Sequence, residues 1–91
     1  MTQQNDEHLE AWFSFDSGPL DRSVGANLKS LREAAELSPA KLGEAIDVSE
    51  DEILSYETGA RRIGPLKMLA LCQILNVKAA DFFRQPRGLF D

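Results

Sequence analysis

Apolar residues recur every three or four positions along the chain from Ser23 onward, which is the spacing of one face of an α-helix. No stretch shows the alternation of β-branched and polar residues that is typical of a strand. The pattern therefore predicts an all-α domain. Its five helices are expected at about 24–36, from Pro39, at about 49–58, from Pro65 and at about 78–84.

Residues with known capping preferences divide these segments. Ser38 followed by Pro39 is typical of a helix start, because serine caps the first turn and proline has no N–H to leave unsatisfied there. Ser49, with Glu52 three residues later, predicts a capping box, and Gly59 is expected to end the third helix. The expected apolar faces comprise Val24, Leu28, Leu31 and Ala35, then Leu42, Ala45 and Ile46, then Ile53 and Tyr56, then Leu66, Leu69, Ala70 and Ile74, and finally Phe82 and Phe83.

The stretch 39–58 predicts two short helices joined by a turn of three or four residues. Gly43 is small where the two helices would approach closely. Asp47 falls in the turn, where a left-handed backbone is needed and Asp tolerates it better than most residues. Ile46, Val48, Ile53 and Tyr56 then form an apolar wedge between the helices, which is the residue pattern of a helix-turn-helix.

Charge is unevenly distributed along the 91 residues, whose formal net charge is −5. Residues 1–22 carry five acids and one base, whereas residues 23–91 carry ten acids and nine bases. We therefore interpret 1–22 as a mobile acidic arm, 23–84 as the folded domain and 85–91 as a C-terminal tail. The arm contains an aromatic cluster that could bind its own domain, a second copy or another protein; it consists of Leu9, Trp12, Phe13 and Phe15.

Composition narrows the class of protein further. At 43% apolar and 27% charged residues, the chain is typical of one globular domain. The longest apolar run, Met68 to Cys72, is too short to span a membrane, and the acidic start is unlike a signal peptide, so a cytoplasmic location is expected. One cysteine and one histidine cannot build a structural zinc site, and no catalytic or phosphate-binding constellation is present. We therefore expect no enzyme, no metal and no cofactor.

From Val24 to about Arg84 the chain resembles the Cro/lambda-repressor-like helix-turn-helix family, also called the XRE family. The resemblance depends on the order and spacing of several motifs rather than on any one of them. These are Val24-Gly25-x-x-Leu28-x-x-Leu31-Arg32, Leu37-Ser38-x-x-x-Leu42-Gly43, Ile46-x-Val48-Ser49-x-x-x-Ile53-x-x-Tyr56-Glu57-x-Gly59-x-Arg61 and Leu66-x-x-Leu69-Ala70-x-x-x-x-Leu75-x-Val77.

The resemblance implies a five-helix bundle that binds double-stranded DNA, usually as a two-fold dimer with its third helix in the major groove. It also implies that Arg32 and Glu57 form a buried ion pair, a structural role that suits two charges in an interior. Residues that correspond to the base-contacting positions of the family are Ser49, Glu50, Asp51, Ser55 and Pro39.

This chain departs from the family pattern at the start of that third helix, where Glu50, Asp51 and Glu52 are consecutive acids. One interpretation is that they only favour the helix dipole in the first turn, Glu52 as half of the capping box. The other is that Glu50 or Asp51 accepts a hydrogen bond from cytosine N4. Neither interpretation raises affinity for DNA, so a phosphate-binding rim has to offset the repulsion. The residues expected to form it are Ser38, Lys41, Arg61, Arg62 and Lys67.

Two functional hypotheses follow. The first is a homodimeric, sequence-specific transcriptional regulator that recognises half-sites about one helical turn apart; one version of it is the antitoxin half of a toxin–antitoxin pair. The alternative is a protein-interaction module that has kept the helix-turn-helix bundle and lost DNA binding. The features that favour the alternative are the run of acids, the net charge, Pro39 and Leu54.

Overall fold

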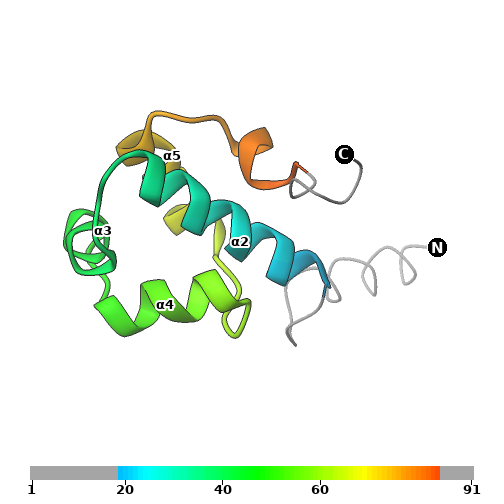
Figure 1. The fold of residues 1–91 in the computed structure, drawn as a ribbon, viewed down its shortest axis with the longest axis horizontal. Helices are drawn as coiled ribbons and strands as arrows, with labels where there is room; N and C mark the ends of the chain where they lie inside the picture. The colour runs from blue at the N-terminus through cyan, green and yellow to red at the C-terminus, as the bar shows by residue number, and fades with distance from the viewer. Residues whose placement is uncertain (1–18, 85–91) are drawn as a thin grey trace.

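The computed structural model describes residues 19–84, which form four α-helices and one short 3-10 helix (Figure 1). No strand occurs among these residues, so the all-α prediction is confirmed. The expectation of five α-helices is wrong for this part of the chain, because only a 3-10 helix forms where the fifth was expected. The elements are α2 (Pro19–Ala34), α3 (Pro39–Ile46), α4 (Glu50–Thr58), α5 (Pro65–Leu75) and η1 (Ala79–Phe82).

The first helix begins at Pro19, five residues before the predicted start. Proline is a good first residue of a helix, because its missing N–H needs no partner there. Residues 19–22 of the predicted arm are consequently the first turn of α2. The aromatic cluster of Leu9, Trp12, Phe13 and Phe15 and the tail 85–91 lie outside the described residues.

The helix boundaries predicted at Ser38, Ser49 and Gly59 are present. The Ser38 hydroxyl accepts from Lys41 N at 3.1 Å, and the Ser49 hydroxyl accepts from Glu52 N at 3.0 Å. Gly59 ends α4 with φ at 82°. The capping box at Ser49 is only half formed, because the Glu52 carboxylate accepts instead from the Tyr56 hydroxyl at 2.5 Å, one turn further along α4.

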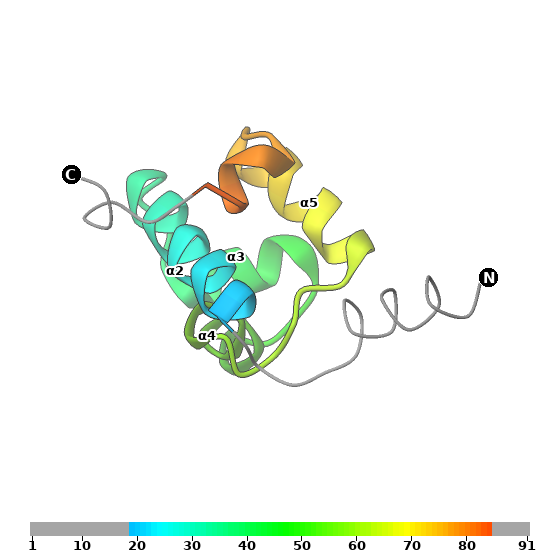
Figure 2. The ribbon, with the colours of Figure 1, turned by 90° about the vertical axis from the view of Figure 1, so that its right-hand side faces the viewer.

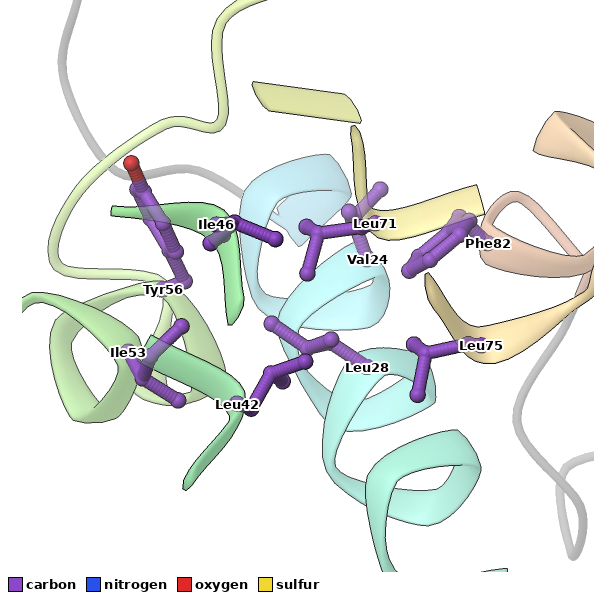
Figure 3. Close-up of a cluster of buried hydrophobic side chains, with 9 residues drawn as sticks. All are labelled: Val24, Leu28, Leu42, Ile46, Ile53, Tyr56, Leu71, Leu75 and Phe82. Carbon is purple, nitrogen blue, oxygen red and sulfur yellow. The ribbon is translucent and has the colours of Figure 1, made fainter. Parts of the chain in front are cut away.

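One hydrophobic core connects all five elements (Figure 3). α2 packs against α4 and η1, while α3 packs against α4 and α5. The approach of α2 to α4 is close: a Cβ on Gly25 would lie 2.2 Å from the Tyr56 carbonyl oxygen. The buried side chains are Val24, Leu28, Leu42, Ile46, Ile53, Tyr56, Leu71, Leu75 and Phe82.

The apolar face predicted for the fourth helix is not the one that packs inward. Leu71 and Leu75 of α5 are buried, whereas Leu66 and Leu69 are 79% and 62% exposed and Ile74 is exposed as well. The helix is apolar on nearly every side, so periodicity alone could not select the buried one. Ala45, which was expected on the buried face of α3, is exposed as well.

Candidate nucleic-acid interface

Helices α3 and α4 form a helix-turn-helix, and the turn between them is held by backbone contacts. Asp47 ends α3 in the left-handed region, with φ at 64°, as predicted. Val48 N donates to the Gly43 carbonyl at 2.9 Å, so the turn folds back onto the end of α3. A Cβ on Gly43 would lie 2.6 Å from the Val48 carbonyl oxygen, which confirms that a small residue is required there.

Helix α4 has one buried side and one side that faces solvent. Ile53, Tyr56 and Glu57 are buried on the inward side. The opposite side begins at the N-cap Ser49 and continues with Glu50, Asp51 and Leu54, all of them exposed; Ser55 lies half-buried at its edge. Four of the predicted base-contacting residues are therefore together on α4, and the fifth, Pro39, is half-buried at the first position of α3.

This outward side of α4 is acidic at its beginning. Glu50 and Asp51 are exposed, and no cation among residues 19–84 forms an ion pair with either of them. Both lie in the first turn, where carboxylates interact favourably with the helix dipole. Glu52 differs from them, because its carboxylate is bonded to the Tyr56 hydroxyl and its side chain is half-buried.

Of the four cations predicted to bind phosphate, two are bonded to other groups of the protein itself. Arg62 forms a two-pronged ion pair with Asp21, at 3.0 Å from Nε to Oδ1 and 3.2 Å from Nη2 to Oδ2. The Lys67 ammonium donates to the Ile46 carbonyl at 2.9 Å, at the end of α3. Arg61 and Lys41 are exposed, and Lys41 has only a weak surface contact with Glu44, at 3.9 Å.

The predicted pair of Arg32 and Glu57 is present and buried, and it ties α2 to the end of α4. The Arg32 guanidinium donates to both Glu57 carboxylate oxygens and also to the Leu37 carbonyl at 2.9 Å. The hydrogen bond to Glu57 raises the pKa of Arg32, which keeps the guanidinium charged. This pair therefore stabilises the packing of α2 against the buried side of α4, and neither residue belongs to the outward surface.

Besides the bond from Lys67 to Ile46, three further contacts among the described residues were not predicted. Asp21 had been assigned to the arm, so its pair with Arg62 had no signal in the sequence. The Tyr56–Glu52 bond, by contrast, has the i, i+4 spacing of a helical pair and could have been found. The Asn27 amide donates to the Phe82 and Arg84 carbonyls at 2.8 and 2.7 Å, and so attaches η1 to α2.

Two side chains of the described residues, Tyr56 and Cys72, have pKa values raised by burial. Burial raises the pKa of the Tyr56 hydroxyl, and its bond to Glu52 raises that pKa further. Burial also raises the pKa of the half-buried Cys72 thiol, which keeps it in the less reactive neutral form. Within residues 19–84 no cluster of metal-ligating side chains occurs, and no helix is long and apolar enough to cross a membrane.

Comparison with known proteins agrees with this geometry. A family model described as a helix-turn-helix domain matches residues 23–82. Uncharacterized HTH-type transcriptional regulators of Sinorhizobium medicae and Rhizobium meliloti are each 34% identical over 70 residues, which is 77% of this chain and 50% of theirs. A further such regulator, of Sinorhizobium fredii, is 33% identical over 70% of this chain and 45% of its own length. The chain thus spans about half the length of these relatives.

Solved structures give the same result for the fold. The clp gene regulator ClgR from Corynebacterium glutamicum superposes with a TM-score of 0.67 at 26% identity, over 71% of this chain and 84% of that one. The restriction-modification controller protein C.AhdI from Aeromonas hydrophila superposes with a TM-score of 0.65, over 68% of this chain and 94% of that one. Its sequence identity of 24% supports similarity of fold alone.

Proposed function

The chain belongs to the helix-turn-helix family of transcriptional regulators, and from this premise we propose that it binds double-stranded DNA in a sequence-specific way. In this proposal it acts as a homodimer and inserts α4 of each protomer into the major groove, at half-sites about one helical turn apart. The observation that carries the proposal is the division of α4 into a buried side and an outward side that begins at Ser49.

The proposed base contacts come from the beginning of α4 and of α3. The Ser49 hydroxyl accepts from Glu52 N, so its own proton remains to donate to a base edge. Glu50 and Asp51 are proposed to accept from cytosine N4, the base-edge donor that suits a carboxylate. Ser55 and Pro39 lie at the margin of this surface, where only smaller contacts are expected. Glu52 is left out, because its carboxylate is bonded to Tyr56.

The proposed phosphate contacts are fewer than the sequence suggested. Arg61 and Lys41 are exposed and are the two side-chain cations assigned to the DNA backbone. Ser38 joins them at the beginning of α3, where its hydroxyl proton and the backbone N–H groups suit an anion. Arg62 and Lys67 receive a different role, which is to hold the loop before α5 and the end of α3 in position.

One specific observation favours a second candidate function. The outward side of α4 starts with exposed acids, and two of the four cations expected to offset them are bonded inside the protein. A protein-interaction module that has lost DNA binding would have such a surface. In that case the outward side of α4, with the exposed Leu54, is the surface that contacts the protein partner.

The experiment that distinguishes the two functions selects genomic fragments that bind the full chain, and then measures the affinity of the best fragment by fluorescence anisotropy. We expect selective binding that Arg61→Ala weakens and that Lys29→Ala, the matched exposed cation on α2, leaves unchanged. Absence of binding to every fragment at about 50 mM salt, where phosphate contacts are strong, would exclude the DNA-binding function.

A further inference from the structure

The outward side of α5 carries an apolar stripe, defined here as Leu66, Leu69 and Ile74. Leu66 and Leu69 are the two most exposed large apolar residues of the described chain, and none of residues 19–84 covers them. The other exposed residues of α5, Pro65 and Gln73, are uncharged. The opposite side of α5 is buried in the core, so this helix has a second apolar surface. An exposed apolar surface of this kind is typical of a contact site.

The chain enters the described domain beside the loop that leads into α5. Asp21, in the first turn of α2, pairs with Arg62, which lies three residues before Pro65. Gly59 also contacts this turn, because a Cβ on Gly59 would lie 2.8 Å from Arg22 Cγ. Figure 2 shows this loop passing the beginning of α2 on its way to α5. The first turn of α2 is therefore in contact with the loop that leads into α5.

The apolar residues of the N-terminal arm recur at helical spacing. Leu9, Trp12 and Phe13 stand at i, i+3 and i+4, and Leu66 and Leu69 of the stripe are likewise three positions apart. Six positions separate Phe13 from Pro19 and ten separate Leu9 from it, stretches of chain that span at most about 22 Å and about 36 Å. This length of chain is sufficient for Leu9, Trp12 and Phe13 to reach α5 from the beginning of α2.

We propose that Leu9, Trp12 and Phe13 pack on the apolar stripe of α5 in the same chain. Large aromatic side chains bury more apolar surface than any other residues, and a short connection gives them a high effective concentration at the stripe. A second copy of the chain would have to find the same surface by diffusion. The inference does not rest on DNA binding, so its failure and the failure of the proposed function are separate results.

Trp12 provides a direct test, because it is the only tryptophan in the chain. In the full chain we expect blue-shifted Trp12 emission and protection from acrylamide quenching. Leu69→Lys, which puts a charge in the middle of the stripe, is expected to shift the emission to the red and raise the quenching constant severalfold. The matched control is Leu54→Lys, which changes an exposed leucine on α4 and is expected to leave Trp12 shielded. Circular dichroism verifies that both variants are folded.

Dilution separates an intramolecular contact from a dimer. Shielding of Trp12 that is unchanged over about a hundredfold range of protein concentration supports the proposal. Shielding that is lost on dilution, in step with dissociation in the ultracentrifuge, would assign the stripe to a second copy and overturn it. Two other results also overturn it: water-like emission of Trp12 in the full chain, and shielding that persists in Leu69→Lys.

Discussion

Arg32 of α2 and Glu57 of α4 form a buried, two-pronged ion pair, with Nε 2.6 Å from Oε2 and Nη2 3.2 Å from Oε1. A buried charge without its partner keeps the cost of leaving water and loses the attraction that offset it. We therefore expect Arg32→Met or Glu57→Leu alone to lower the free energy of unfolding by about 3–5 kcal/mol. Urea denaturation of the full chain measures the effect.

The paired replacement distinguishes this explanation from a simple loss of contacts. Arg32→Met combined with Glu57→Leu leaves no charge in the interior and is expected to be more stable than either single variant. The Leu37 carbonyl, which accepts from Arg32, loses its donor in the double variant, so full recovery of stability is not expected. A double variant as unstable as the sum of the single ones would contradict the argument.

Tyr56 is expected to make the domain sensitive to alkali. Burial and the bond to Glu52 raise the pKa of its hydroxyl in the folded protein, so the folded state holds this proton more tightly than the unfolded state. The resulting stability is complete below the ordinary tyrosine pKa of about 10, and it is lost as the pH rises above that value, by at most about 1.4 kcal/mol per unit.

Two measurements check the role of Tyr56. Since Tyr56 is the only tyrosine, the ultraviolet absorbance of its phenolate reports its ionisation directly, and it is expected to appear together with unfolding. Tyr56→Phe removes the titrating group and one hydrogen bond, so it should cost about 0.5–1.5 kcal/mol at neutral pH and lose stability less steeply in alkali. A phenolate that forms near pH 10 while the circular dichroism remains native would disprove the expectation.

Local rules were sufficient to predict the helix-turn-helix itself. The residues that begin and end these helices interact only with backbone groups of their own or the next turn, so their roles can be predicted from a few neighbouring residues. They are Ser38, Asp47, Ser49 and Gly59. Gly43 belongs to the same group, because the turn that it must accommodate lies only five residues away. The surface formed by the beginning of α4 was predictable for this reason.

The features that were missed depend on contacts between distant parts of the chain. Asp21 pairs with a residue 41 positions away, and Lys67 reaches a carbonyl 21 positions away, so neither partner had a local signal. The buried side of α5 was decided by the position of α3 and η1, since both sides of that helix are apolar. Nothing in the sequence indicated that Arg62 and Lys67 have partners inside the protein, because a paired and an unpaired cation look the same in a sequence.

Glu50 determines whether the acidic start of α4 reads a base. If its carboxylate accepts from cytosine N4, Glu50→Ala should abolish the preference at one base pair, a loss of about 1–3 kcal/mol of discrimination. Selection of bound sequences from a randomised operator measures the preference. Glu33→Ala, an exposed acid on α2, is the matched control and should not alter it. Equal strengthening of binding to every sequence by Glu50→Ala would make the carboxylate a repulsive neighbour of the DNA.

The salt dependence of DNA binding counts the cations that reach phosphate. With Lys41 and Arg61 from each protomer of a dimer, the slope of log K against log salt should be about −3 to −4, whereas all four predicted cations would give about −7. Arg61→Ala should reduce the slope to about −2.

Arg62→Ala is expected to leave the slope unchanged. It should lower the free energy of unfolding by about 1–3 kcal/mol, because it leaves the buried carboxylate of Asp21 without its partner. A slope near −7 that Arg62→Ala or Lys67→Ala reduces would mean that these side chains exchange their internal partners for DNA.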